Sequence, residues 1–206
     1  MAIQLSIGKL ILVTMLCVGV VACSEQEPIS SINDFTEIAG KKWDLTKYKN
    51  SADYVTEAEA EAAFFYTSSD GYVINDALRK GKASIIKKHA AVIKDLASLI
   101  NKSRNKKCKF YRFIHAHPKL LDQMKTRGQI YVERGFFSAT LERYPDDEGQ
   151  FSNREIIIIG TSPRCADISP YSRYESESEI LFPPGTEFVV TKNMSGQYIY
   201  LKEKVD

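Results

Sequence analysis

Four consecutive isoleucines, Ile156–Ile159, constrain the fold of this chain more than any other segment. β-Branched side chains restrict the backbone and pack well on the pleated surface of a sheet. Because the run has no polar position, neither face of such a strand suits contact with water. The run therefore predicts a central strand that is buried on both faces, and the rest of the chain must supply the layers that cover it.

The segments that precede this strand have helical patterns. Thr56-Glu57-Ala58-Glu59 forms a capping box, which predicts a helix that ends near Tyr66. A second short helix is expected over 72–79, where Lys80-Gly81 closes it. Over 83–100 apolar residues recur at helical spacing, which predicts one amphipathic helix.

The second half of the chain has the pattern of short strands. Besides 156–159, extended segments are expected at 109–114, 128–132, 135–141, 180–182, 186–192 and 197–202. A short helix or turn is expected over 118–124, and a polar loop over 144–153. Helices followed by a run of mostly antiparallel strands predict the α+β class.

The first residues have the pattern of an export signal. Residues 1–22 contain Lys9 and then an apolar core from Leu10 to Val21, which is too short to span a bilayer comfortably. The segment ends in Val20-Val21-Ala22-Cys23, which resembles a bacterial lipobox. We therefore expect lipidation of Cys23 and anchoring at the outer membrane of the cell envelope. An ordinary secretory signal with a chance cysteine, and hence a secreted protein, is the alternative.

Residues 23–42 have the composition of a tether, because Glu, Ser, Gln, Pro and Asn dominate their first half. The remaining residues, 43–206, have the length of one domain. The formal net charge is +2 and the isoelectric point is about 8.2. The basic cluster between Lys102 and Lys109 is interpreted as a solvated loop, so no nucleic acid partner is predicted.

The cysteines and histidines indicate a cross-link rather than a metal site. Of the four cysteines, Cys17 leaves with the signal and Cys23 is the expected lipidation site. In an oxidising compartment the remaining Cys108 and Cys165 are a candidate disulfide. The three histidines have no zinc-ligand spacing with either cysteine, so no metal is predicted.

An acidic pair, Glu177-Ser178-Glu179, lies directly before the apolar residues 180–182. If Glu179 opens a strand, the period of two places both carboxylates on the same face. Neighbouring carboxylates repel each other unless a cation compensates. The pair would suit a site that stabilises a positive transition state and also holds a cationic acceptor. An acidic loop that leads into a strand is the ordinary alternative.

Three motifs, taken together, resemble a known enzyme family. Tyr111-Arg112, then Gly135-Phe136-Phe137-Ser138-Ala139-Thr140, then Glu177-Ser178-Glu179 with the tail 180–186, follow one another along the chain. With the helical stretches 63–66 and 71–79, this ordered set resembles the arginine–serine–glutamate class of mono-ADP-ribosyltransferases, which includes bacterial exotoxins. The family's Ser-Thr-Ser is Ser-Ala-Thr in this chain.

The resemblance implies a fold and an activity. The fold would have N-terminal helices packed on a split, mostly antiparallel two-sheet core, with the catalytic domain over 43–206. The activity would be transfer of ADP-ribose from NAD to arginine side chains of a host or bacterial target protein, with release of nicotinamide. An NAD glycohydrolase on the same scaffold and a catalytically silent lipoprotein that serves as a binding module are the alternatives.

The resemblance also assigns roles to individual residues. Glu179 would stabilise the oxocarbenium-like ribose, and Glu177 would orient the acceptor guanidinium. Arg112 would bind a phosphate or ribose oxygen of NAD, and Ser138 would orient Glu179. Either Phe136 or Phe137 would stack near nicotinamide. Tyr171 and Tyr174 would belong to the loop that recognises the target, or else pack as anchors beneath it.

Overall fold

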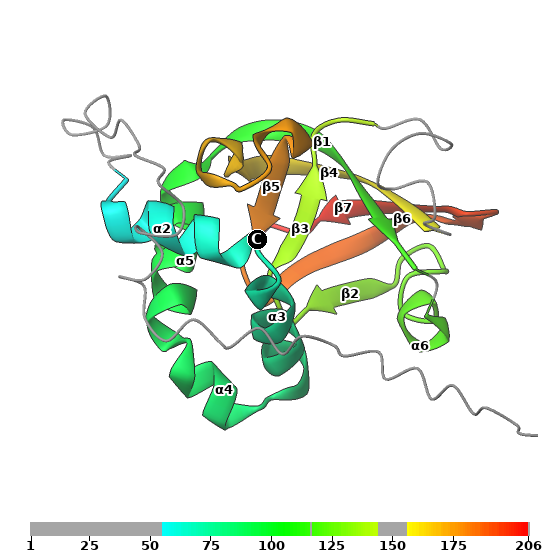
Figure 1. Cartoon of the computed structure of the whole chain (residues 1–206). Helices are drawn as coiled ribbons and strands as arrows, with labels where there is room; N and C mark the ends of the chain where they lie inside the picture. The colour runs from blue at the N-terminus through cyan, green and yellow to red at the C-terminus, as the bar shows by residue number, and fades with distance from the viewer. Residues whose placement is uncertain (1–54, 116, 144–155, 206) are drawn as a thin grey trace, which may run out of the picture.

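Figure 1 shows the computed structural model of the chain, which describes residues 55–115, 117–143 and 156–205. The expected signal peptide 1–22, the lipidation site Cys23, the tether 23–42 and the polar loop 144–153 lie outside these described residues. Within the described residues, no helix has both the length and the apolar sequence that a membrane span requires. The helices α2 to α5 gather on one side of the molecule and the strands on the other (Figure 1).

The helices occupy the first half of the described chain. Their bounds are α2 Glu57–Tyr66, α3 Asp70–Lys80, α4 Ala83–Lys88 and α5 Ala90–Ser103, and the short α6 Pro118–Leu121 follows the first strand. The expected capping box is confirmed, because Glu59 N donates to Thr56 Oγ1 and Thr56 N donates to Glu59 Oε2. Helix α3 ends at Gly81, whose φ of 65° is the left-handed conformation that glycine adopts without strain.

The single helix predicted over 83–100 is wrong. The chain leaves the helical conformation at His89, with φ −102° and ψ 18°, and this break separates α4 from α5. The His89 ring is buried and lies 5.8 Å from the Phe65 ring, centroid to centroid. Helix α4 buries no residue, whereas α5 buries four. The apolar spacing of 85–86 therefore does not continue the buried face of α5.

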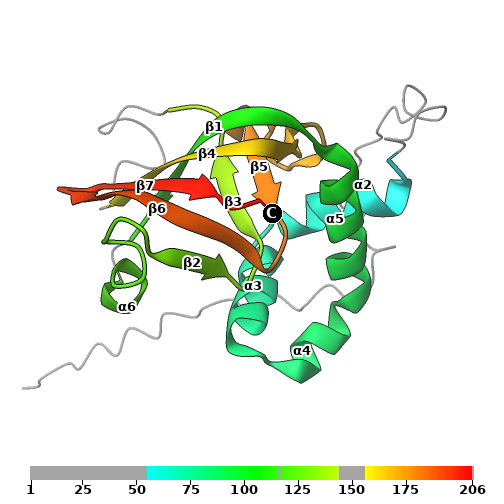
Figure 2. The same ribbon diagram turned by 180° about the vertical axis from the view of Figure 1, so that it is seen from behind.

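Seven strands form one hydrogen-bonded set, in the order β1-β3-β5-β4-β7-β6-β2. Their bounds are β1 Arg104–Ile114, β2 Ile130–Glu133, β3 Phe137–Thr140, β4 Ile156–Asp167, β5 Glu179–Phe182, β6 Thr186–Ser195 and β7 Tyr198–Glu203. All pairings are antiparallel except that of β4 with β7. Figure 2 shows β6 and β7 extending away from the helices on the far side of the molecule.

The two-sheet core that the resemblance implies does not appear as two separate sheets among the described strands. Strand β1 pairs with both β3 and β4, and β5 also pairs with both of them. The long β4 allows this, because most of its length pairs with β1 and β7 while its last two residues pair with β5. The four strands therefore close a ring, from which β7, β6 and β2 continue.

The isoleucine run lies at the centre of the sheet, as predicted. Ile156, Ile157 and Ile158 are buried between β1 and β7, and Ile159 is half-buried. The run ends at Gly160, where a β-carbon would overlap the ring of Phe110. The glycine therefore lets a fully buried aromatic ring lie directly against β4.

Two buried clusters make up the core. One lies between the helices and the sheet, and it joins residues of α2, α3 and α5 to Phe136, Ala166 and Leu181. The other lies within the strands, where the rings of Phe110, Phe137, Phe182 and Phe188 contact one another. Strand β5 supplies side chains to both clusters in alternation, so its position is fixed from two sides.

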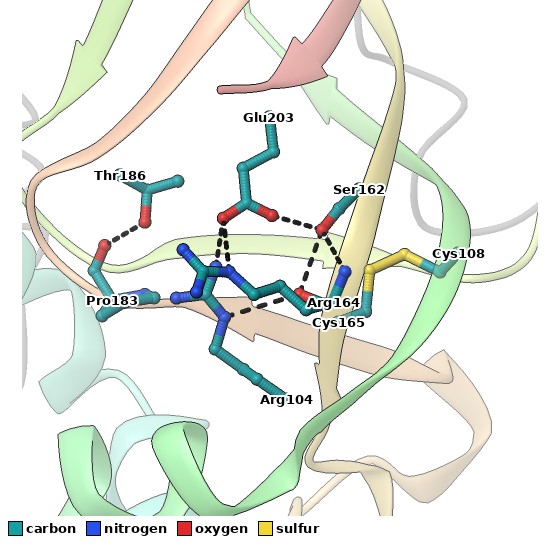
Figure 3. Close-up of polar contacts among 8 residues, drawn as sticks. All are labelled: Arg104, Cys108, Ser162, Arg164, Cys165, Pro183, Thr186 and Glu203. Atoms are coloured by element: carbon teal, nitrogen blue, oxygen red, sulfur yellow. Dashed lines mark hydrogen bonds and ion pairs between the residues drawn. A yellow bond between two sulfur atoms is a disulfide. The ribbon is translucent and has the colours of Figure 1, made fainter. Parts of the chain in front are cut away.

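The basic cluster predicted to be a solvated loop instead forms the end of α5 and the start of β1. Lys102 pairs with Glu59 at 2.7 Å. Arg104 pairs with Glu203 of β7, which also contacts Arg164 and accepts a hydrogen bond from Ser162 (Figure 3).

A disulfide lies beside this group of charged residues. Cys108 and Cys165 are bonded to each other, with their Cα atoms 6.0 Å apart (Figure 3). The bond links β1 to β4 where their register shifts, between the pairs Lys106–Cys165 and Cys108–Ser162. It therefore fixes a part of the sheet that regular hydrogen bonding holds less completely.

Candidate active site

A cavity of about 360 Å³ opens between the helices and the closed ring of strands. Helix α3 and the end of α2 form one wall, strands β1 and β3 form another, and the loop that leads into β5 closes it. The side chains along these walls that carry polar or aromatic groups are Tyr66, Thr67, Ser68, Tyr72, Asn75, Arg79, Tyr111, Arg112, Phe113, Ser138, Thr140, Tyr174, Glu177 and Glu179. The three sequence motifs therefore meet at one site.

Glu179 is the buried carboxylate of this cavity. It is the first residue of β5, is 7% exposed, and its Oε1 accepts a hydrogen bond from Ser138 Oγ at 2.6 Å. Burial raises the pKa of Glu179 to about 7, and the nearby charge of Glu177 adds to the rise. The hydrogen bond from Ser138 and the charge of Arg112 oppose the rise but do not cancel it.

The pairing of β3 with β5 explains why Ser138 reaches Glu179. Thr140 lies directly opposite Glu179 in the antiparallel register, and Ser138 lies opposite Leu181. Because Ser138 and Thr140 are two residues apart, both side chains lie on the same face of β3. That face lines the cavity, so the Ser-Ala-Thr sequence places two hydroxyls beside the chain that carries Glu179.

Arg112 lies on β1 and reaches the same cavity. Its Nη1 donates a hydrogen bond to the carbonyl oxygen of Ser138 at 3.0 Å, and its guanidinium lies 4.4 Å from the centre of the Phe137 ring. Among the residues that the structure describes, no carboxylate forms an ion pair with Arg112. The guanidinium is therefore held by a carbonyl and an aromatic ring rather than by an ion pair.

Glu177 lines the cavity, but not for the reason given by the sequence. It ends a short 3-10 helix, Glu175–Glu177, and the next residue, Ser178, has φ 48° and ψ 44°. The strand begins only at Glu179, so the alternation that was expected to place both carboxylates on one face of a strand is wrong. The left-handed turn at Ser178 brings them to one cavity instead.

The two phenylalanines predicted to stack near nicotinamide do not line the cavity. Phe136 is 0% exposed and packs against Tyr66 on the helical side. Phe137 is 1% exposed and packs in the cluster within the strands. Both rings are enclosed because the helices cover one face of β3 and the sheet covers the other, so neither offers a free face to a ligand.

The two loop tyrosines differ in position. Tyr171 is 5% exposed and packs in the helical cluster, which matches the interpretation of an anchor beneath the loop. Tyr174 is 54% exposed and lies at the wall of the cavity. Of the two, only Tyr174 is accessible to a partner.

Helix α3 contributes residues that the sequence interpretation missed. Asn75 Nδ2 donates to Tyr66 Oη at 2.6 Å, and Asn75 Oδ1 accepts from Phe136 N at 2.8 Å. Arg79 pairs through Nε and Nη2 with both carboxylate oxygens of the buried Glu133, at 2.9 and 3.2 Å. Burial alone would raise the pKa of Glu133, but the bonds from Arg79 lower it overall. The four-residue spacing of Asn75 and Arg79, which places both on one helix face, was the available signal.

Within the described residues, no group of three or more histidine, cysteine or acidic side chains is arranged to hold a metal ion. The cavity offers carboxylates, hydroxyls and guanidinium groups. A buried carboxylate beside a second carboxylate and an unpaired arginine suits a substrate with a developing positive centre and an anionic part.

Solved structures with the same fold are ADP-ribosyltransferases. The chain aligns with ADP-ribosyltransferase HopU1 of Pseudomonas syringae pv. Tomato DC3000 with a TM-score of 0.63 and 23% identity, covering 84% of this chain and 88% of that one. It aligns with the eucaryotic mono-ADP-ribosyltransferase ART2.2 with a TM-score of 0.63 and 17% identity, covering 85% and 75%. Exoenzyme S from Pseudomonas aeruginosa, solved with carba-NAD bound, gives 0.60 and 21%, covering 84% and 86%. The fold is therefore that of the mono-ADP-ribosyltransferases.

Sequence comparison gives the family. The family model described as ADP-ribosyltransferase exoenzyme matches residues 40–204, and this chain belongs to that family. A curated relative, the NAD(+)--protein-arginine ADP-ribosyltransferase Tre1 of Serratia proteamaculans (strain 568), is 30% identical over 146 residues. The alignment covers 69% of this chain but only 31% of Tre1, so the chain corresponds to about a third of that relative.

Proposed function

We propose that this protein transfers ADP-ribose from NAD to arginine side chains of a target protein and releases nicotinamide, as a member of the arginine–serine–glutamate class. The observation that carries the proposal is the bond of Ser138 to the buried Glu179, in a cavity that Glu177 and Arg112 share. The similarity to Tre1, an NAD(+)--protein-arginine ADP-ribosyltransferase, supports arginine as the acceptor.

Glu179 would act on the first step. When the bond between ribose and nicotinamide breaks, nicotinamide leaves as a neutral ring with the bonding electrons, and the ribose carbon takes on oxocarbenium character. The carboxylate of Glu179 is buried and has no ion-pair partner among the described residues. A buried, uncompensated negative charge is stabilised most when positive charge develops beside it, which lowers the barrier.

Glu177 would act on the acceptor. A guanidinium pairs with a carboxylate through two parallel hydrogen bonds, which fixes its plane and direction. Held in this way, a guanidinium nitrogen forms the new bond to the ribose carbon, and the proton that it loses passes to Glu177 or to water. Because Glu177 and Glu179 line one cavity, the two carboxylates can serve the two positive groups at the same time.

Arg112 would bind the dinucleotide. Its charge has no carboxylate partner within the described part of the chain, and its planar guanidinium suits a phosphate or ribose oxygen. Since Phe136 and Phe137 are enclosed, an aromatic contact with NAD would have to come from the rings at the cavity wall, such as Tyr72 and Tyr111.

Export and lipid anchoring at the cell envelope are a second part of the proposal, which rests on residues 1–23 of the sequence alone. Metabolic labelling with an alkyne fatty acid, followed by membrane fractionation, compares the wild type with Cys23→Ser. Label and membrane association in the wild type, with loss of both in the variant, would support the lipoprotein. A cleaved but unlabelled wild type would point to an ordinary secreted protein.

Labelled NAD tests the enzymatic proposal. The mature protein is incubated with NAD that carries the label in its adenylate part, together with agmatine or a cell lysate. Label on agmatine or on protein, removable by an enzyme that cleaves ADP-ribosyl-arginine, is the expected result. Free ADP-ribose alone would mean a glycohydrolase, and unchanged NAD would mean a silent binding module.

A further inference from the structure

The turn between the two cavity glutamates has an unfavourable backbone conformation. Ser178 is the one non-glycine residue with positive φ among those that the structure describes. A residue with a β-carbon is disfavoured in the left-handed region, so surrounding contacts must hold it there. The conformation matters because Ser178 sets the path of the chain from Glu177 to Glu179.

Thr140, the last residue of β3, and the two residues that follow it supply those contacts. Thr140 Oγ1 donates a hydrogen bond to the carbonyl oxygen of Glu177 at 2.7 Å. Leu141 N donates to the carbonyl oxygen of Ser178 at 3.1 Å. Ser178 Oγ donates to Glu142 Oε1 at 2.6 Å, and Glu142 N donates to Thr140 Oγ1 at 3.1 Å. Residues 140–142 therefore hold the Glu177–Ser178 turn at two carbonyls and one side chain.

This β3 clamp, residues 140–142, ties the turn to the strand that carries Ser138. The hydrogen bonds within the loop, Glu177 N to the Tyr174 carbonyl at 3.0 Å and Ser178 N to the Glu175 carbonyl at 3.4 Å, only shape the turn itself. The bonds from residues 140–142 instead fix where the turn lies relative to β3, the strand that pairs with β5. Strand β3 therefore helps to fix both glutamates, Glu179 through its pairing with β5 and Glu177 through the bond from Thr140.

We propose that Glu142, acting through Ser178, and Thr140, acting through the Glu177 carbonyl, are positioning residues that decide whether ADP-ribose passes to a guanidinium or to water. The inference rests on the proposed function and adds Glu142 and Ser178, which lie outside the cavity wall, and Thr140, which lines the cavity but acts here through its bond to the Glu177 carbonyl. Bond cleavage depends on Glu179, which Ser138 holds independently of the turn. Capture of the ribose carbon by arginine depends on the direction of Glu177, which the β3 clamp sets.

The location of Glu142 makes the inference testable without disturbing the NAD site. Glu142 is exposed, and neither Glu142 nor Ser178 belongs to the cavity wall. A change at either position can therefore reach the reaction only through the backbone of the turn. A loosened turn should let water compete with the acceptor while NAD binding and cleavage persist.

The experiment measures the ratio of transfer to hydrolysis in the mature full-length protein. Transfer of labelled ADP-ribose to agmatine and release of free ADP-ribose are followed together for the wild type, Ser178→Ala, Glu142→Ala and the double variant. Each single variant is expected to lower the ratio roughly 3- to 10-fold, with the KM for NAD in hydrolysis unchanged. Because both remove the same hydrogen bond, the double variant should lower it no further than the larger single effect.

Two further variants separate the hydroxyl from the backbone. Ser178→Gly relieves the left-handed strain while removing the bond to Glu142, so the turn loses its restraint and the ratio should fall at least as far as in Ser178→Ala. Thr140→Val removes the bond to the Glu177 carbonyl at nearly constant volume, and should lower the ratio as well. The matched control is Glu187→Ala. It removes a carboxylate on β6, outside the cavity wall, that pairs with Lys204 at 2.7 Å. Its ratio should equal that of the wild type.

The outcomes separate this inference from the proposed function. If the wild type transfers ADP-ribose but both single variants keep its ratio, or if their effects multiply in the double variant, the clamp is overturned and the proposed function stands. An equal loss of transfer and hydrolysis would also overturn the clamp, because it would indicate general damage to the site. A wild type that only hydrolyses NAD, or leaves it intact, would refute the proposed function and the clamp with it.

Discussion

Two buried glutamates of the sheet, Glu179 on β5 and Glu203 on β7, have opposite surroundings. Glu179 is 7% exposed and Glu203 is 2% exposed, and each accepts a hydrogen bond from a serine hydroxyl. Glu203 lies between the guanidiniums of Arg104 and Arg164 (Figure 3). Glu179 forms no ion pair among the described residues, and the charge of Glu177 raises its pKa while that of Arg112 lowers it. The fold therefore compensates one buried charge and leaves the other exposed to repulsion.

The difference shows that the partner, and not burial alone, marks the functional carboxylate. Glu133 is as buried as Glu203, yet its bidentate contact with Arg79 lowers its pKa. Glu179 has no such contact, and its pKa rises to about 7. A compensated carboxylate stabilises the fold, while an uncompensated one is unfavourable in the resting protein and suits a site where positive charge will develop.

The largest expected effect is at the compensated glutamate. Glu203→Gln removes the counter-charge of the Arg104 and Arg164 guanidiniums. It should lower the free energy of unfolding by about 3–5 kcal/mol. Denaturant titration measures the loss. The folded fraction should keep the wild-type KM for NAD, since Glu203 lies outside the cavity. A variant as stable as the wild type would contradict the claim that the compensated Glu203 stabilises the fold.

The same substitution at Glu179 should act in the opposite sense on stability and strongly on rate. Glu179→Gln removes the charge that would stabilise the oxocarbenium, and should slow both transfer and hydrolysis about 10²–10³-fold. Residual transfer at more than a tenth of the wild-type rate would contradict the assignment of this residue.

The stability change at Glu179 follows from the direction of its pKa shift. The folded pKa of Glu179, about 7, lies above the ordinary glutamate pKa of 4.5, so the folded state favours the protonated carboxyl. The stability that the wild type gains from a protonated Glu179 is complete below pH 4.5 and is lost as the pH rises through 7. Glu179→Gln should therefore be more stable than the wild type at pH 8, on the order of 1–3 kcal/mol, and the gain should vanish near pH 4.5. Thermal unfolding at both values measures it.

Sequence patterns predicted the elements whose signal is local. The isoleucine run, the capping box at Thr56 and the strands on either side of 183–185 are where the residue types place them. The functional motifs at Arg112, Ser138 and Glu179 also meet at one cavity. In each case the chemistry depends on a few neighbouring residues, which a single sequence displays.

The errors come from contacts between distant segments. Nothing local shows that the chain leaves the helical conformation at His89, whose ring packs against Phe65. The left-handed turn at Ser178 depends on bonds from residues 140–142, which lie far away in the sequence. The enclosure of Phe136 likewise depends on helices that cover β3. All three features depend on tertiary contacts, so the period of a local sequence pattern could not predict them.

The disulfide should affect stability on the side of the compensated glutamate. The disulfide joins two residues that are 57 positions apart in the sequence. Replacing Cys108 and Cys165 together by serine removes this cross-link and should lower the free energy of unfolding by about 2–4 kcal/mol. Because the bond joins β1 to β4 next to Arg164, well away from the cavity wall, the transfer rate at low temperature should stay within about twofold of the wild type. Guanidinium titration and initial rates test the two parts. A large loss of rate with little loss of stability would show that the two regions are coupled.

The smallest expected effect is at Ser138, and it tests how Glu179 is kept usable at neutral pH. The Ser138 hydroxyl lowers the pKa of Glu179 against the larger effect of burial, so Ser138→Ala should raise that pKa above 7. Catalysis needs the carboxylate, so the rate of NAD cleavage should rise with pH through about 7 in the wild type and at a higher pH in the variant. If the pKa rises by about one unit, the ionised fraction at pH 7 falls from about a half to about a tenth, so the rate of the variant should be roughly 5-fold lower at pH 7 and closer to wild type at pH 9. Profiles of kcat/KM against pH measure the displacement. A variant that is slower by the same factor at every pH would show that Ser138 orients Glu179 without tuning its charge.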